Sequence, residues 1–252
     1  MSEATHNGGT PTVVLVHGAF ADASSWNGVV ELLQAKGMSV TAPANPLRGI
    51  SIDSAYIASV LEQIEGPVLL VGHSYAGAVI GNAASKASNV VGLVFVSAFA
   101  MEDGELLGEA AATSKDSILG PLQVARNYPG AAGEQAVEIS IDPTGFREAF
   151  CADLPAEQGA VMAATQRPIA QLAFTEPNGP PAWKHLPSWA VVGTGDKAAG
   201  TDLTRSMAER AGATITELDG SHVIMISQPG AVARVIVEAL AAVGAMPVGA
   251  GA

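Results

Sequence analysis

The sequence of 252 residues predicts an α/β fold, with a mostly parallel sheet of about six strands and helices on both faces. Short apolar runs rich in β-branched residues recur along the chain, and amphipathic helical patterns separate them. Hydrophobic residues form 48% of the sequence and charged residues only 14%, against about 25% in an average domain. Alternating strand and helix units pair their strands in parallel, so helices must cover both faces of the sheet.

The expected strands are apolar runs that are too short for helices. They lie at residues 12–16, 38–41, 68–71, 90–96, 189–192 and 214–218, of which 38–41 and 214–218 are the weaker candidates. Such runs indicate strands that are buried on both faces.

The expected helices follow the 3.6-residue period between these strands. The first begins after one of the serines at positions 24–25 and ends at Gly37. A second begins at Asp53 and ends at Gly66, and a last one follows Ser227 and Pro229.

The regular alternation lapses between residues 101 and 187 and resumes at residue 189. A connection of this length usually carries a lid or binding role. We therefore expect residues 1–252 to form a single domain, with a cap or lid insertion at about 101–187 over the sheet's edge. Its larger apolar side chains are expected either to line an apolar acyl or ring pocket or to form the insertion's own small core: Leu106, Leu107, Met162, Leu172, Phe174 and Trp183.

The charge balance weighs against a nucleic-acid partner. The chain carries 12 basic and 24 acidic residues, a formal net charge of −12, which repels phosphate backbones. The single cysteine, Cys151, cannot form an intrachain disulfide and is expected to be a packing residue. No apolar run reaches the roughly 18 residues that a membrane span needs, and the N-terminus does not read as a secretory signal. We expect a soluble, cytoplasmic protein; a monomer and a homodimer are both compatible with the sequence.

The clearest chemical motif is VLLVGHSYAG at residues 68–77, a buried strand followed by a tight turn and a helix of small residues. A serine in such a turn is lifted above the sheet as a nucleophile, and its neighbours must be small because the strand and helix backbones pass close to it. Gly72 and Ala76 satisfy that requirement, although the strict motif has glycine at the position of Ala76. This context predicts that Ser74 is a nucleophile.

A nucleophilic serine needs a base, and the chain has only five histidines. His6 lies in a polar tail, His185 precedes a strand and so lies at the wrong end of the sheet, and His73 should point away from its neighbour Ser74. His222, in the loop after the last strand, is therefore the expected base. His17, at the carboxyl end of the first strand, remains the rival.

The base in turn requires a carboxylate at the carboxyl end of another strand, to orient the imidazole and stabilise its cation. Asp196 in the segment GTGDK fits that position. Glu102 and Asp103 are competing candidates, and Asp219 is a weaker one.

The remaining part is a pair of backbone amides that would bind an oxyanion. Tyr75, directly after the nucleophile, would supply one, and Ala19 or, as the alternative, Phe20 would supply the other. The sequence shows neither a dinucleotide fingerprint nor a P-loop lysine, and no cysteine or histidine pair has the spacing of metal ligands, so no cofactor is expected.

Together, the segments VVLVHGAFADASSW, GHSYAG, GTGDK and DGSHV resemble the α/β-hydrolase superfamily, in particular its compact branch of small esterases and hydroxynitrile lyases. The resemblance covers nearly the whole chain and implies an α/β-hydrolase fold with a variable cap. It also implies a triad of Ser74, Asp196 and His222, with oxyanion amides at Ala19 and Tyr75. The family's sheet usually begins with extra antiparallel strands, for which the residues before Pro11 leave no room, so a shortened N-terminus is expected.

The expected function is that of a cofactor-free serine hydrolase, which cleaves a carboxylic ester or lactone of a small, apolar substrate through an acyl-enzyme. Two alternatives remain open. The same triad could serve a hydroxynitrile-lyase-like C–C lyase, or the chain could be a ligand receptor that retains a hydrolase pocket.

Overall fold

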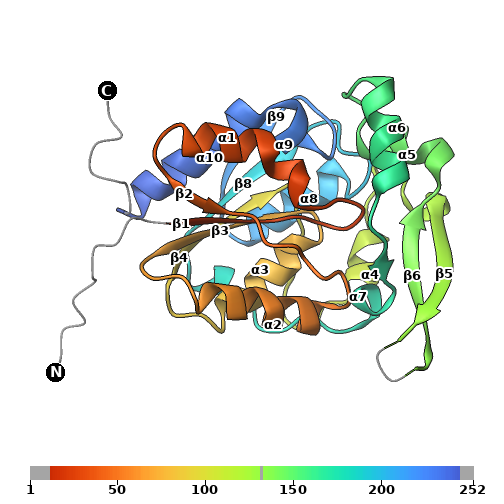
Figure 1. The fold of residues 1–252 in the computed structure, drawn as a ribbon, viewed down its shortest axis with the longest axis horizontal. Helices are drawn as coiled ribbons and strands as arrows, with labels where there is room; N and C mark the ends of the chain where they lie inside the picture. The colour runs from red at the N-terminus through yellow and green to blue at the C-terminus, as the bar shows by residue number, and fades with distance from the viewer. Residues whose placement is uncertain (1–11, 131–132, 245–252) are drawn as a thin grey trace.

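The computed structural model describes residues 12–130 and 133–244, and in this part of the chain one parallel sheet forms the centre of the fold (Figure 1). The sheet has six strands in the order β2-β1-β3-β4-β8-β9, and every pair is parallel. The predicted fold class is confirmed. The six strands are β1 (Thr12–Val16), β2 (Ser39–Thr41), β3 (Val68–His73), β4 (Val90–Val96), β8 (Ser188–Gly193) and β9 (Thr214–Leu218).

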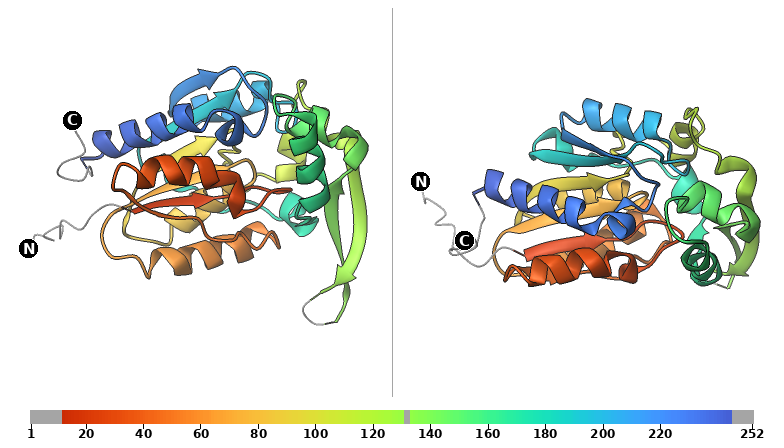
Figure 2. Two further views of the ribbon diagram at one scale, coloured as in Figure 1. Left: turned by 45° about the horizontal axis from the view of Figure 1, so that its top comes forward. Right: turned by 90° about the horizontal axis from the view of Figure 1, so that it is seen from above.

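Helices cover both faces of this sheet (Figures 1 and 2). Helices α1 and α10 pack together on one face and α2 and α3 on the other, while α8 packs against β8 and β9. The central strands are almost fully buried, which explains their continuous apolar runs. These helices and a short 3-10 turn are η1 (Ala23–Trp26), α1 (Asn27–Gln34), α2 (Ile50–Leu61), α3 (Ala76–Ala84), α8 (Thr201–Arg210), α9 (Ile224–Ser227) and α10 (Pro229–Ala242).

Helix α2 begins earlier than predicted, at Ile50 and not at Asp53. The prediction was wrong because it placed Asp53 at the start of the helix, whereas this residue lies within the first turn. Its carboxylate is fully buried and accepts hydrogen bonds from the Arg48 amide at 2.9 Å and from the Tyr75 hydroxyl at 2.8 Å. Asp53 therefore links α2 to the turn before α3 instead of starting a helix.

The insertion joins β4 to β8, two neighbouring strands, and lies over the carboxyl ends of the sheet, at the right of Figure 1. It contains a second, antiparallel sheet in the order β5-β6-β7, whose long β5–β6 hairpin stands away from the main body (Figure 2). The elements of the insertion are α4 (Leu107–Ala111), η2 (Gly120–Leu122), β5 (Gln123–Pro129), β6 (Gln135–Ile141), α5 (Pro143–Phe150), α6 (Ala156–Thr165), β7 (Ile169–Ala170), α7 (Leu172–Thr175) and η3 (Ala182–Lys184).

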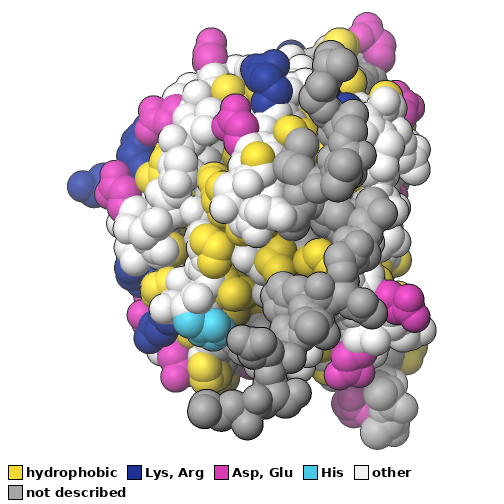
Figure 3. All heavy atoms as spheres, turned by 90° about the vertical axis from the view of Figure 1, so that its left-hand side faces the viewer, with side chains coloured by type: hydrophobic (Ala, Val, Ile, Leu, Met, Phe, Trp, Pro, Cys, Tyr) yellow, Lys and Arg dark blue, Asp and Glu magenta, His cyan; other side chains and the backbone are white. Residues whose placement is uncertain are grey.

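On the face opposite the insertion, acidic and basic side chains are interspersed around the rim (Figure 3). Among residues 12–130 and 133–244, no helix combines the length and the hydropathy needed to span a bilayer. Cys151 is a free, fully buried thiol, and burial raises its pKa to about 11. The expectation of a shortened N-terminus rests on residues 1–11, which lie outside the described residues.

The link between Asp53 and Tyr75 leads to a stability prediction. Burial raises the pKa of Asp53, and the Tyr75 hydroxyl is one of the donors that oppose this rise. Replacing Tyr75 by phenylalanine leaves a buried carboxyl group short of a donor, so we expect Tyr75→Phe to lower the free energy of unfolding by about 1–3 kcal/mol. Urea unfolding at pH 7 measures this free energy. Tyr56→Phe is the control, because Tyr56 lies on the exposed side of α2, the helix that contains Asp53. This variant should change the free energy of unfolding by less than about 0.5 kcal/mol.

Candidate active site

Ser74 occupies the turn between β3 and α3 and has a left-handed backbone conformation, with φ of +55°. Few residues other than glycine adopt this conformation, and it persists only where the surroundings hold it. Here the Ser74 amide donates to the Val96 carbonyl at 3.2 Å, and the Ser74 carbonyl accepts from the Gly77 and Phe99 amides at 2.9 and 3.2 Å. The turn that the sequence motif predicts is therefore held by hydrogen bonds from three sides.

Two glycines let other backbone segments approach this turn. A Cβ atom on Gly72 would lie 2.7 Å from the Ala76 carbonyl oxygen, at the point where strand and helix pass each other. One on Gly18 would lie 2.7 Å from both the His73 carbonyl oxygen and the Ser74 Cβ. Gly18 is thus required by its close contact with Ser74, and its backbone lies directly beside the serine.

His222 and Asp196 form a buried pair. The Nδ1 atom of His222 lies 2.8 Å from the Asp196 Oδ2, and both residues are about 1% exposed. His222 and Ser74 line the same cavity. The structure thus brings together the three residues that the sequence singled out, from the ends of β3, β8 and β9. Because Nδ1 faces the carboxylate, Nε2 is the ring nitrogen left for a substrate or a serine hydroxyl.

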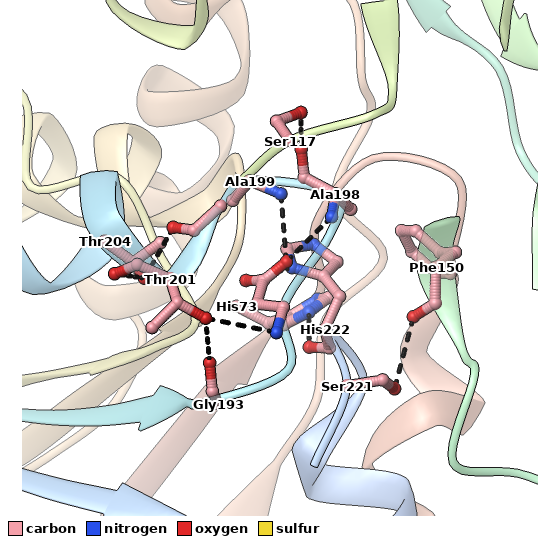
Figure 4. A network of polar contacts seen from close by, with 12 residues as sticks. His73, Ser117, Phe150, Gly193, Ala198, Ala199, Thr201, Thr204, Ser221 and His222 are labelled. Carbon is pink, nitrogen blue, oxygen red and sulfur yellow. Dashed lines mark hydrogen bonds and ion pairs between the residues drawn. The ribbon is translucent and has the colours of Figure 1, made fainter. Parts of the chain in front are cut away.

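The turn after β8 holds the other oxygen of Asp196. The Oδ1 atom accepts hydrogen bonds from the Ala198 and Ala199 amides at 2.9 and 3.0 Å (Figure 4). Thr201 in turn donates its hydroxyl to the Gly193 carbonyl at 2.7 Å and accepts from the Asp196 amide. With both oxygens engaged, the carboxylate is fixed in the orientation that faces the imidazole.

The three amides considered as oxyanion donors differ in their hydrogen bonding. The Phe20 amide donates to the Arg167 carbonyl at 3.1 Å. For the Ala19 and Tyr75 amides, no acceptor is found among the described residues. Both residues line the same cavity as Ser74. Ala19 and Tyr75 therefore have free donors at this cavity, whereas the donor of Phe20 is already in use.

The other histidines in the described part of the chain do not share the position of His222 beside Ser74 and Asp196. His17 is fully buried, and its Nε2 accepts from the Asn45 amide at 2.9 Å, so that lone pair is already used. The Nε2 atom of His73 lies 3.0 Å from the His222 carbonyl oxygen and donates to it, and His73 does not line the cavity that contains Ser74. His185 is exposed and lies just before β8, and His6 lies outside the described residues.

The competing carboxylates lie elsewhere. Glu102 is ion-paired with Lys184 at 2.5 Å on the surface. Asp103 and Asp219 are exposed. None of these three carboxylates forms a hydrogen bond or ion pair with His222, whereas Asp196 does.

A cavity of about 330 Å³ contains Ser74 and His222 and extends under the insertion. Among the described residues that line it, none is Asp, Glu, Lys or Arg. Of the insertion residues predicted to line a pocket, Leu107 and Phe174 do so. Leu172 borders a separate groove under the hairpin, and Leu106, Met162 and Trp183 line neither cavity. The cavity that contains Ser74 is lined by Ala19, Phe20, Ser74, Tyr75, Phe99, Leu107, Gly108, Ala111, Ala112, Ser117, Leu119, Gly120, Gln123, Ile139, Phe150, Ile169, Gln171, Phe174, Thr175, Ala198, Ala199 and His222.

Sequence reasoning did not identify Phe150, whose ring packs against that of His222 with the ring centres 5.0 Å apart. The available signal was the amphipathic pattern of residues 143–150, in which Phe146, Ala149 and Phe150 are the buried positions. That pattern indicates a packed helix face, but it does not reveal that the face packs against His222.

No cluster of three or more histidine, cysteine, aspartate or glutamate side chains that could hold a metal ion occurs in the described part of the chain. Residues 13–235 match the model of the alpha/beta hydrolase family. The chain belongs to this family. No curated protein matches the sequence.

Solved structures agree with this assignment at the level of the fold. Polyneuridine aldehyde esterase is 21% identical, with a TM-score of 0.75 over 92% of this chain and 99% of that one. The methylesterase MES16 from Arabidopsis is 19% identical, with a TM-score of 0.72 over 91% and 98%. A pyrethroid hydrolase from Sphingobium faniae JZ-2 is 21% identical, with a TM-score of 0.69 over 90% and 96%. At such identities the likeness shows a shared fold.

Burial of His17 leads to a pH prediction. Burial is the main cause that lowers its pKa to about 4, from 6.5 in an unfolded chain. Between these values the unfolded chain binds a proton that the folded protein does not, so the stability contributed by neutral His17 is complete above pH 6.5 and falls as the pH drops towards 4. We expect the free energy of unfolding to be lower at pH 5 than at pH 7.5, by about 2 kcal/mol from this residue.

Denaturant unfolding of the wild type and of His17→Gln at the two pH values measures that contribution. The variant should show a smaller loss at pH 5. Part of the loss should remain, because burial also lowers the pKa of His73. An equal pH dependence in both proteins would contradict the prediction.

Proposed function

We propose that this member of the alpha/beta hydrolase family is a serine esterase that cleaves a small, neutral and apolar carboxylic ester or lactone through an acyl-enzyme. The observation that carries the proposal is the buried His222–Asp196 pair beside a cavity that also contains Ser74 in a left-handed turn. The similar structures named as an esterase, a methylesterase and a hydrolase agree with it.

In the proposed reaction, the Ser74 hydroxyl attacks the ester carbonyl while Nε2 of His222 takes its proton. The imidazolium then returns that proton to the leaving alcohol, which leaves the acyl group on Ser74. A water molecule, deprotonated by the same nitrogen, releases the acid and restores the serine. Asp196 orients the His222 ring through Nδ1 and stabilises the positive charge of the imidazolium. The Ala198 and Ala199 amides stabilise the negative charge of Asp196 by donating hydrogen bonds to its other oxygen.

The amides of Ala19 and Tyr75 are the proposed donors to the oxyanion. Their availability supports this role, as does the position of Tyr75 at the start of α3. Backbone donors that are already in place need no reorganisation as negative charge develops on the carbonyl oxygen, which is the source of their catalytic effect.

The nucleophile assignment is tested by removing one hydroxyl. Ser74→Ala should lose at least about 10⁴-fold in kcat/KM for p-nitrophenyl acetate and butyrate, because triad members act as a unit. Ser59→Ala, which removes an exposed hydroxyl on α2, should keep the wild-type rate. A fluorophosphonate probe should label the wild type and not Ser74→Ala. An active Ser74→Ala protein would falsify the assignment, and aldehyde release from mandelonitrile without ester turnover would indicate a lyase instead.

The cavity wall predicts which esters are hydrolysed. A carboxylate on the substrate would lose its hydration without gaining a cationic partner from the wall, which costs several kcal/mol. We expect p-nitrophenyl butyrate to exceed mono-p-nitrophenyl succinate by at least about 100-fold in kcat/KM, each rate divided by that ester's spontaneous hydrolysis. Equal normalised rates would contradict a neutral, apolar substrate.

A further inference from the structure

The carboxylate of Asp153 binds Ser221, the residue directly before His222. Asp153 belongs to the insertion, in the segment after α5, and Ser221 belongs to the loop after β9. The Ser221 amide donates to Oδ2 of Asp153 at 3.0 Å, and the Ser221 hydroxyl donates to Oδ1. Because both carboxylate oxygens bind one residue, they restrain its direction as well as its position.

The same part of the insertion also contacts the base directly. The carbonyl oxygen of Phe150 lies 3.5 Å from the Ser221 hydroxyl oxygen, as Figure 4 shows, a weak second contact of the hydroxyl that Asp153 binds, and the Phe150 ring packs on the His222 ring. Phe150 and Ser221 are almost fully buried, whereas Asp153 lies at the surface. The end of α5 and the residues around the base therefore form one packed unit.

On its other side, the His222 segment is held by the main sheet. His73, the last residue of β3, donates from Nε2 to the His222 carbonyl at 3.0 Å, and the two rings lie 4.6 Å apart. From the side of the sheet, His73 holds the carbonyl of His222, and the Gly195 amide, just after β8, donates to the Gly220 carbonyl at 2.9 Å. From the insertion, Asp153 holds Ser221, the residue between them.

The charge of Asp153 suits this contact. Although Asp153 lies at the surface, its carboxyl group is partly buried, which by itself would raise its pKa. The hydrogen bonds from the Ser221 hydroxyl and amide, with a smaller contribution from the Ser227 hydroxyl, outweigh this effect and hold the pKa below its ordinary value. At neutral pH the group is therefore a carboxylate, and it can only accept. Hydrogen bonds to a charged acceptor are shorter and stronger than those between neutral groups.

We propose that Asp153 is a positioning residue: acting through Ser221, it sets the orientation of His222 towards Ser74 and makes that alignment depend on the place of the cap insertion. The reading of His222 as the base rests on the proposed function. The contact itself does not, and it can be tested without turnover.

The test compares two aspartates of the same helix region. Asp142 precedes α5, and its carboxylate also accepts from a backbone amide and a hydroxyl, but both belong to Thr144 in the same helix and both bind Oδ1. Asp153→Asn removes one of the two acceptor oxygens that bind Ser221, whereas Asp142→Asn makes the same substitution in a carboxylate that contacts no residue near His222 through its side chain. Both variants are assayed with p-nitrophenyl butyrate and unfolded in urea.

We expect Asp153→Asn to lower kcat between about tenfold and 100-fold with KM within about twofold, because small misplacements of a reacting group have effects of this size. Asp142→Asn should keep the wild-type kcat. A folded Asp153→Asn protein with wild-type kcat overturns the proposal. If Asp153→Asn does not fold, Ser221→Ala removes only the hydroxyl half of the contact, and its kcat should fall in the same direction but by less; an unchanged kcat overturns the proposal.

A second readout observes the base directly. The proton on Nδ1 of His222 faces Asp196, so its NMR resonance should lie far downfield, and His222→Gln assigns it. The resonance should shift or disappear in Asp153→Asn and stay in place in Asp142→Asn; no change in Asp153→Asn overturns the proposal. If the wild type hydrolyses no ester, the proposed function fails, and this resonance alone decides whether Asp153 positions His222.

Discussion

The structure depends on how closely backbone segments approach one another around Ser74. The serine can hold a left-handed conformation because the Val96 carbonyl and the Gly77 and Phe99 amides bind its backbone. Backbone segments come this near to the turn because side chains are missing at Gly18, Gly72 and Gly77, and a Cβ atom on Gly77 would lie 2.6 Å from the Phe99 carbonyl oxygen. The buried strands β1, β3 and β4 bring these segments together, so the apolar core is what allows a polar, unusual turn to exist.

The polar groups around this turn are buried and hydrogen-bonded in a definite order. Asp196 uses one oxygen for two backbone amides and the other for His222, and His222 is held in turn by contacts to its ring and its carbonyl. A buried carboxylate without such partners would be costly, so this loop must form completely or not at all. The free amides at Ala19 and Tyr75 stand out against this pattern of satisfied groups.

The insertion has two roles in this arrangement. It supplies much of the apolar wall of the cavity, through side chains such as Leu119, Ile139 and Phe150, and its α5 segment touches the loop of His222. Changes in the insertion can therefore alter which molecules fit the cavity and also how His222 is held. Its small antiparallel sheet was not predicted because β5 is mostly exposed, so its apolar alternation is weak.

The local sequence pattern was sufficient to predict the strands of the sheet and the turn at Ser74. Continuous apolar runs indicate buried strands, and small residues at fixed spacing indicate where backbone segments approach each other closely. It also identified His222 and Asp196 as candidates, since parallel strands bring their carboxyl ends to one rim. It misplaced the start of α2, because the hydrogen bond from Tyr75 to Asp53 joins residues far apart in the chain. The same reason applies to the occupied amide of Phe20, to the insertion residues that reach the cavity and to the contact of Asp153 with Ser221. Each depends on which distant segments meet, and only the tertiary structure decides that.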